Sequence, residues 1–162
     1  MTTECQPGRL TFSQFDERFL KRSWEWLQDP EIKRLTMTPD FTRDQQRSWF
    51  NRLPETKDYM IWGLLCGDAP IGAAGLKHIT AKDAEYWGYI GEREYWGTGL
   101  GGEMMQFAIE KAGALGLRGL YLTVHKDNVR AVALYAKAGF RIVGESAGVL
   151  KMEISIAKTN VR

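Results

Sequence analysis

The chain has 162 residues, a formal net charge of +2 at pH 7, and 44% hydrophobic and 26% charged residues. These values are typical of one folded globular domain, so we expect a single domain over residues 1–162 and exclude a disordered or fibrous chain. The net charge is too small to indicate nucleic acid or a membrane as a partner, and we expect neither.

Cys5 and Cys66 are the only cysteines. This pair provides neither a disulfide framework nor a four-ligand metal site, so we expect no bound metal and a reducing compartment. The first residues, MTTECQPGRL, lack the apolar segment of a signal peptide. No stretch approaches the roughly 20 apolar residues of a membrane span, so we expect a cytoplasmic protein.

The first third of the chain is predicted to be mainly helical. A short strand is expected at residues 9–13, and helices are expected at residues 14–27, 31–35 and 43–53. Pro30 ends the first helix, because proline supplies no N–H donor and disfavours a helical residue before it. Thr42 and Gln45 have the spacing of a capping box at the start of the third helix.

The middle of the chain changes to strand-like patterns. Apolar and aromatic runs occur at residues 59–66, 71–79 and 85–90. The turn-forming stretches GDAP and TAKD separate these runs, so we expect an antiparallel meander.

Helices and strands alternate in the rest of the chain. We expect helices at residues 98–115 and 128–138, the second capped by Asp127, and strands at 120–124, 140–143 and 149–156. A right-handed strand–helix–strand connection places one parallel pair in an otherwise antiparallel sheet. The predicted fold is therefore α/β, with an α+β mixed sheet of about seven mostly antiparallel strands, helices on both faces and a site at the parallel pair.

The stretch EYWGTGLGGEMM at residues 94–105 contains the pattern G-x-G-x-x-G at the start of a predicted helix. Peptide N–H groups there lack intrahelical acceptors, and with the helix dipole they suit a pyrophosphate. A flexible turn is the alternative interpretation. A dinucleotide-binding loop would follow the first strand of a parallel unit, whereas this loop follows a meander, so that interpretation is disfavoured.

A second motif, KDNVRAVALYAKAGFRIVGE, lies at residues 126–145. With the glycine loop it resembles the GNAT superfamily of acetyl-CoA-dependent N-acetyltransferases, whose signature is matched by Asn128, Ala131, Tyr135, Gly139 and Phe140. The segments WEWLQDPEI, APIGAAGL and AEYWGYIG are similar to the branch of ribosomal-protein-alanine and spermidine acetyltransferases, so the resemblance covers nearly the whole chain. One position departs from the family pattern: Glu94 stands where an arginine or glutamine is usual, with Arg93 beside it.

The resemblance implies the GNAT acyltransferase fold and acetyl-CoA as co-substrate. The cofactor-binding residues that it implies are Ile90, Gly91, Tyr95, Trp96, Gly97, Thr98, Gly99, Leu100, Gly101, Gly102, Asn128 and Tyr135. It also implies that Asn128 bonds the pantetheine arm and that Tyr135 is the general acid or thiolate stabiliser. The two share a helix face, being about two turns apart, although Tyr135 as an amphipathic core residue is the alternative. A backbone N–H on the strand that ends at Ile90 is expected to polarise the thioester oxygen.

Glu85 is the first candidate for a general base. Strand alternation puts it on one face with Trp87 and Tyr89, and the family often uses a glutamate on this strand to take the ammonium proton. A solvated strand-end carboxylate is the alternative. His78 is the second candidate because an imidazole can work near neutral pH, and an acceptor amine that is already neutral needs no base. His78 and Trp87 are also expected to contact the acceptor.

The acceptor pocket is expected across the sheet from the cofactor, between the N-terminal helices and the last hairpin, with residues 36–42 as a loop over it. Tryptophan rings in these segments can form an aromatic wall against a flat or sugar-like acceptor.

The expected activity is transfer of an acetyl group from acetyl-CoA to a primary amine of a small molecule, with amino-sugar nucleotides as the first acceptor class. A protein N-terminal amine and a polyamine are the alternatives, and an acetyl-CoA sensor without turnover is the non-enzymatic alternative. The sequence fits a monomer or a homodimer.

Overall fold

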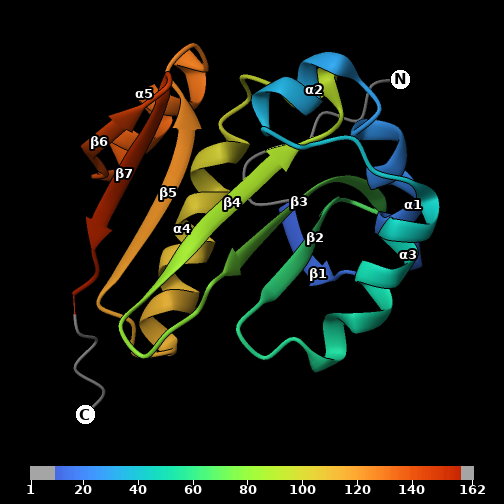
Figure 1. The fold of residues 1–162 in the computed structure, drawn as a ribbon, viewed down its shortest axis with the longest axis horizontal. Coiled ribbons are helices and arrows are strands. Elements are labelled where there is room, and N and C mark those ends of the chain that lie inside the picture. The colour runs from blue at the N-terminus through green and yellow to red at the C-terminus, as the bar shows by residue number, and fades with distance from the viewer. Residues whose placement is uncertain (1–9, 158–162) are drawn as a thin grey trace.

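The computed structural model describes residues 10–157, which form one twisted sheet with helices on both faces (Figure 1). The strands are β1 (Leu10–Gln14), β2 (Met60–Cys66), β3 (Ala69–Lys77), β4 (Asp83–Ile90), β5 (Gly119–His125), β6 (Arg141–Ser146) and β7 (Val149–Ser155). The α-helices are α1 (Glu17–Trp26), α2 (Pro30–Leu35), α3 (Arg43–Arg52), α4 (Leu100–Ala114) and α5 (Val129–Ala138), and short 3-10 helices cover Leu53–Glu55 and Arg93–Tyr95.

The order of strands across the sheet is β1-β2-β3-β4-β5-β7-β6. Only β4 and β5 are parallel neighbours among the described strands, and their register covers just Asp83–Glu85 against Gly119–Tyr121. Beyond this short register the two strands diverge and leave a V-shaped opening (Figure 1). The predicted mixed sheet with one parallel pair is confirmed.

Local capping explains where the helices begin. Helix α1 starts three residues later than predicted because the Asp16 side chain accepts a hydrogen bond from the Arg18 N–H at 3.0 Å and caps the helix. The capping box of α3 is confirmed by reciprocal hydrogen bonds between Thr42 and Gln45 of 2.8 and 3.1 Å. The predicted cap of α5 is wrong: Asn128 caps the helix instead of Asp127.

Each face of the sheet carries its own core. Helix α4 buries one side of its surface, including Leu100 and Met104, in a cluster that also contains residues of α5, of β2 to β5 and of β7. On the other face, Phe19 of α1 is completely buried among Phe15, which precedes α1, and aromatic residues of α3 and β4. The two layers of helices therefore cover opposite faces at the level where β4 and β5 separate.

Three features of residues 10–157 bear on the class of protein. Cys66 at the end of β2 is disulfide-bonded, which corrects the expectation of reduced cysteines; Cys5 lies outside the described residues. Within this range, no helix has the length and apolar character needed to cross a bilayer. The described His, Cys, Asp and Glu side chains also form no group of three or more that could bind a metal ion.

Candidate active site

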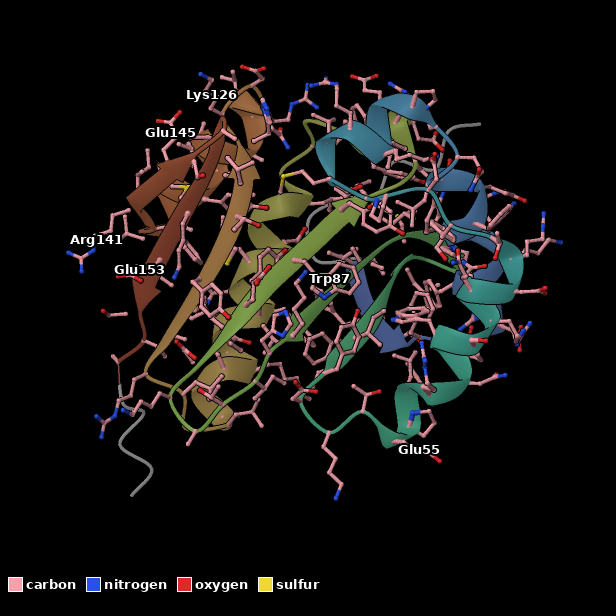
Figure 2. The ribbon with its side chains drawn as sticks, in the orientation of Figure 1. Glu55, Trp87, Lys126, Arg141, Glu145 and Glu153 are labelled. Carbon is pink, nitrogen blue, oxygen red and sulfur yellow. The ribbon has the colours of Figure 1, made fainter. Side chains whose placement is uncertain are left out.

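A cavity of about 1250 Å³ passes through the opening between β4 and β5. On one side of the sheet it is lined by α1 to α3 and by the loop over residues 36–41. On the other side it is lined by the glycine loop, the start of α4 and the first turns of α5. Trp87 lies near the middle of the sheet, inside this region (Figure 2). The divergence of the two strands thus connects the predicted cofactor site and the predicted acceptor pocket in one cavity.

The same divergence leaves peptide groups of β4 without a strand partner. The Gly91 N–H donates to the Ile71 carbonyl oxygen at 2.7 Å, so alternate peptides of β4 point towards β3. The peptides of Gly88 and Ile90 consequently face the opening, where β5 no longer pairs with them. The Ile90 carbonyl accepts from the Trp96 indole N–H at 2.8 Å, whereas no strand among residues 10–157 pairs with the two N–H groups, which can therefore bind a ligand.

The glycine loop presents the bare N-terminus of α4. Gly99 is the N-cap residue and provides no side-chain hydrogen bond, so the first N–H groups of α4 have no side-chain acceptor. Gly97 and Gly99 have positive φ angles of 73° and 88°, and a Cβ added to either would project into open space. Free N–H groups, the helix dipole and unfilled space together fit the pyrophosphate of coenzyme A.

Basic side chains near this loop differ from the family pattern. Arg93 forms ion pairs with Asp29 and Glu31 of the α2 region, at 2.6 and 2.5 Å. These contacts direct its guanidinium towards α2, and they hold the pKa of the Asp29 carboxyl below its usual range. Arg130 lines the cavity, lies over the Trp96 ring at 5.9 Å and has no ion pair among the described residues. Arg130 is therefore an available cation beside the loop, and it was absent from the predicted site.

Two phenols lie on the cofactor side of the opening. Tyr135 of α5 packs edge-on against Tyr86 of β4, with ring centroids 6.2 Å apart. Burial raises the pKa of Tyr135 to about 12 and raises the pKa of Tyr86 well above its usual range, and the neighbouring Tyr135 adds to the shift of Tyr86. Both phenols therefore keep their protons at neutral pH.

The raised pKa of Tyr135 predicts the shape of the basic limb of the pH–rate profile. A proton donor with an ordinary tyrosine pKa of about 10 would lose its proton as the pH rises through that value. The activity of the enzyme would fall over the same pH range. Because Tyr135 stays protonated until the pH approaches about 12, we expect kcat to remain level between about pH 8 and pH 10. A fall in kcat centred near pH 10, in a protein shown by circular dichroism to be folded there, would contradict this assignment.

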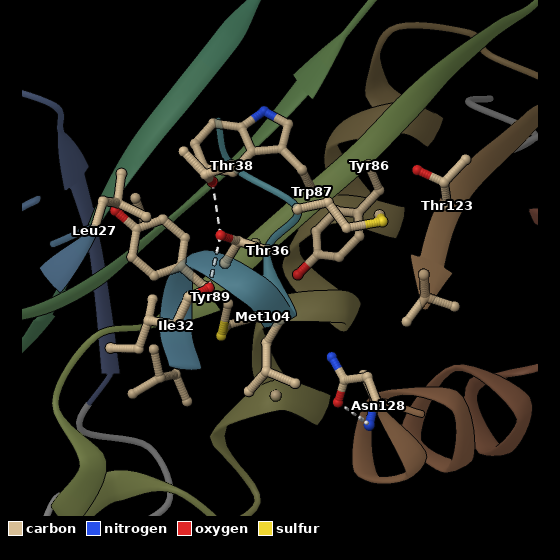
Figure 3. Close-up of a pocket in the computed structure, with 18 of the residues that line it drawn as sticks. Leu27, Ile32, Thr36, Thr38, Tyr86, Trp87, Tyr89, Met104, Thr123 and Asn128 are labelled. Carbon is tan, nitrogen blue, oxygen red and sulfur yellow. Dashed lines mark hydrogen bonds between the residues drawn. The ribbon is translucent and has the colours of Figure 1, made fainter. Parts of the chain in front are cut away.

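The acceptor side of the cavity is mainly aromatic. The rings of Tyr59, Trp87 and Tyr89 lie in a row, with adjacent centroids 6.3 and 6.4 Å apart, and the Trp49 ring meets Tyr59 edge-on. Thr36 and Thr38 are joined by a hydrogen bond of 2.6 Å in the loop beside these rings (Figure 3). The predicted wall and the predicted loop therefore both border the cavity.

Carboxylates beside the acceptor pocket are paired with basic side chains. Glu85 pairs with Lys77 at 3.4 Å, and its side chain is 15% exposed. Glu31 pairs with Arg93. Arg34 also lines the cavity and has no ion pair within residues 10–157. The pocket is therefore aromatic with a free cation at its edge, and it lacks an acidic cluster within the described residues.

Most predicted site residues come together in this cavity: Glu85, Trp87, Ile90, Tyr95, Trp96, Gly97, Gly99, Leu100, Gly101, Asn128 and Tyr135 all line it. Gly91, Thr98 and Gly102 do not. The Gly91 N–H is bonded to Ile71, the Thr98 hydroxyl donates to the Tyr95 carbonyl at 2.6 Å, and the Gly102 N–H donates to the Gly99 carbonyl. These three shape the loop and stand outside the lining.

Two expectations about the acceptor side are corrected. His78 is exposed in the turn after β3, where a positive φ of 53° carries its side chain away from the strand, and it does not line the cavity. The last hairpin also contributes no lining residue, because β7 pairs with β5 on the side away from β4. Strands β2 to β4 form that wall instead.

Comparisons with known proteins agree with this architecture. Residues 9–141 match the family model of the acetyltransferase (GNAT) domain. The chain is 44% identical over 140 residues to GCN5-related N-acetyltransferase 6, chloroplastic, of Arabidopsis thaliana; the match covers 82% of this chain and 49% of that protein, so this chain spans about half of its length.

Solved structures with low sequence identity share the fold. Spermidine N-acetyltransferase from Vibrio cholerae, in complex with CoA and spermine, has a TM-score of 0.83 and 22% identity, with 93% of this chain and 97% of that chain covered. N-acetyltransferase PseH of Campylobacter jejuni has a TM-score of 0.73 and 18% identity, with coverages of 92% and 99%. The family match extends over most of the sequence and includes the whole glycine loop and the start of α5, and the chain belongs to the GNAT N-acetyltransferase family.

Proposed function

We propose that this protein transfers the acetyl group of acetyl-CoA to a primary amine of a small molecule. This proposal rests mainly on one cavity, which passes through the β4–β5 opening. The cavity connects the N-terminus of α4, which suits a phosphate, to an aromatic pocket. A donor bound along α4 and an acceptor bound over the aromatic rings would meet beside Gly88 and Ile90. The structural neighbour PseH has been solved with acetyl coenzyme A, which supports the donor.

The residues around the opening suit aminolysis of a thioester. The neutral amine nitrogen attacks the acetyl carbon, a C–N bond forms, and the C–S bond breaks with its electron pair going to sulfur. Glu85 takes the proton that makes the amine neutral, and Tyr135 donates a proton to the departing sulfur. The free N–H groups of Gly88 and Ile90 face the place where negative charge develops on the carbonyl oxygen. The ammonium loses two protons in all: Glu85 passes the first to solvent, and the second leaves the nitrogen after the attack and restores the Tyr135 hydroxyl. One proton therefore ends on the thiol and one is released.

The acceptor pocket favours an amine on a flat, weakly charged body. Tyr59, Trp87 and Tyr89 offer ring faces on which a sugar or another planar group can stack. Arg34, which is free of ion pairs among the described residues, suits an acceptor that also carries a phosphate. An amino-sugar nucleotide combines these features and is our first acceptor class. An N-terminal amine of a protein is second, and the paired carboxylates disfavour a polyamine.

An acceptor panel tests the proposed function. The purified protein is given acetyl-CoA with amino-sugar nucleotides, N-terminal peptides and polyamines, and release of free thiol is measured beside calorimetric binding of acetyl-CoA. We expect the highest kcat/KM with an amino-sugar nucleotide. Acetyl-CoA binding without thiol release above background for any acceptor would instead identify a sensor without turnover.

Replacing Glu85 by glutamine tests the proposed base. We expect kcat to fall about 10-fold near neutral pH, a modest loss for a general base because a fraction of the amine is already neutral. The difference from the wild type should shrink as the pH is raised and the amine loses its own proton. Steady-state rates measured across pH check both statements.

Glu145 provides the matched control for Glu85. It is also a glutamate beside a lysine, 3.9 Å from Lys126, but it lies at the periphery far from Trp87 (Figure 2). Glu145→Gln should leave the rate unchanged at every pH. Equal rates for Glu85→Gln and the wild type near neutral pH would remove Glu85 from the mechanism.

A further inference from the structure

Tyr86 occupies a special place on β4. Strand alternation directs it to the face opposite Trp87, towards α4, where it is only 4% exposed. Its hydroxyl lies over Gly88: a Cβ added at Gly88 would be 2.6 Å from the Tyr86 oxygen and 2.9 Å from the Met104 methyl carbon. The absence of a side chain at Gly88 therefore lets the phenol reach the residue whose peptide faces the opening.

The Tyr86 hydroxyl lacks a hydrogen-bond partner within the described part of the chain, although its ring is packed against Tyr135 and α4. Figure 3 shows this hydroxyl directed into the cavity, towards Met104 and the side of Asn128. The Tyr86 oxygen is not among the fully buried side-chain atoms that lack a partner, and Tyr86 lines the cavity, so its hydroxyl is accessible from the cavity. A ligand bound in the cavity can therefore accept a hydrogen bond from it.

We infer that Tyr86 donates a hydrogen bond to the carbonyl oxygen of the bound acetyl group and is a second catalytic phenol beside Tyr135. This inference rests on the proposed function. The Tyr86 hydroxyl lies beside Gly88, whose peptide faces the opening, so both donors are within reach of an acceptor atom held there. Tyr135 approaches from α5 instead, so the two phenols serve different atoms: Tyr86 the carbonyl oxygen and Tyr135 the sulfur.

Negative charge develops on the carbonyl oxygen during the reaction, and a hydrogen bond from Tyr86 would stabilise it. Attack by the amine moves an electron pair from the C=O bond onto oxygen, and collapse returns it as the C–S bond breaks. Tyr86 keeps its proton throughout and only donates a hydrogen bond, so the overall proton balance is unchanged. Donors placed in advance at such an oxygen stabilise the transition state more than the ground state.

The test is the infrared carbonyl stretch of ¹³C-labelled acetyl-CoA bound to the protein without an acceptor. Hydrogen bonds to the carbonyl lower this frequency, so we expect a lower value for the wild-type complex than for free acetyl-CoA. In Tyr86→Phe the frequency should move back towards the free value. We expect kcat to fall about 50-fold, because the peptide donors remain, with acetyl-CoA affinity nearly unchanged.

Three further variants make the result specific. Gly88→Ala puts a methyl group 2.6 Å from the phenol oxygen, which must move away, and should shift the frequency in the same direction as Tyr86→Phe. Tyr135→Phe should lower the rate without changing the frequency. Tyr121→Phe, on the partly exposed β5 residue beneath Lys151, should leave the frequency unchanged.

An unchanged carbonyl frequency in a folded Tyr86→Phe protein that still binds acetyl-CoA overturns the inference. So does an equal frequency change in Tyr121→Phe. The frequency is measured without an acceptor, so failure of every acceptor in the panel would end the proposed transfer activity while the spectrum still decides the role of Tyr86.

Discussion

Tyr135→Phe should lower kcat about 10³-fold while acetyl-CoA binding stays within about threefold of the wild type. The expected loss lies in the usual range for a positioned proton donor acting in the transition state. Phenylalanine preserves the ring and its edge-on contact with Tyr86, so packing of α5 against β4 should persist. Steady-state kinetics with the best acceptor and calorimetric titration with acetyl-CoA measure the two quantities separately.

The burial of Tyr135 makes this variant informative. The same desolvation that raises its pKa to about 12 would fit a core tyrosine with no chemical role. A core role predicts lower thermal stability and an unchanged kcat for the remaining folded protein. The acid role predicts unchanged thermal stability and a lower kcat. An unchanged kcat with a good acceptor would therefore mean that Tyr135 only packs in the core and that solvent protonates the sulfur.

Much of the fold could be predicted because its local signals agree with one another. The capping box of Thr42 and Gln45, the break at Pro30 and the turn residues between strands each fix a boundary through neighbouring residues alone. The parallel pair followed from the handedness of the connection between β4 and β5. The cap of α5 could not be decided in this way, because Asp127 and Asn128 are both good capping residues and only the backbone path after β5 selects Asn128.

The site divides along the same line. The glycine loop could be recognised in the sequence because the positive φ angles at Gly97 and Gly99 favour glycine, and because the helix start has no capping side chain. Tyr86 could not be, because alternation assigns it to a core face and only the departure of β5 opens that face to a ligand. Arg130 could not be recognised either, because its position beside the glycine loop depends on its contact with the Trp96 ring, and the two residues are far apart in sequence. The chemical roles of Glu85 and Tyr135 stay predictions until the variants are measured.

Gly99→Val should raise the dissociation constant of acetyl-CoA about 100-fold. A β-branched residue in the left-handed region costs about 1–2 kcal/mol, and the loop can relieve this strain only by turning peptide N–H groups away from the phosphate. Each charged hydrogen bond lost in this way is worth about 1.5–3 kcal/mol. The open space around Gly99 means that no clash with the rest of the protein contributes, so the fold should survive. Isothermal titration with acetyl-CoA, and with CoA, measures the effect.

Gly116 supplies a control at the opposite end of the same helix. It follows α4 with a φ of 76°, close to the 88° of Gly99, and a Cβ there also meets nothing within 4 Å. Gly116→Val therefore imposes similar backbone strain without touching the helix N-terminus. The two variants should lose similar thermal stability, while only Gly99→Val loses affinity for acetyl-CoA. Equal affinities in the two would mean that the strain is absorbed without moving the loop, and that the N-terminus of α4 does not bind the pyrophosphate.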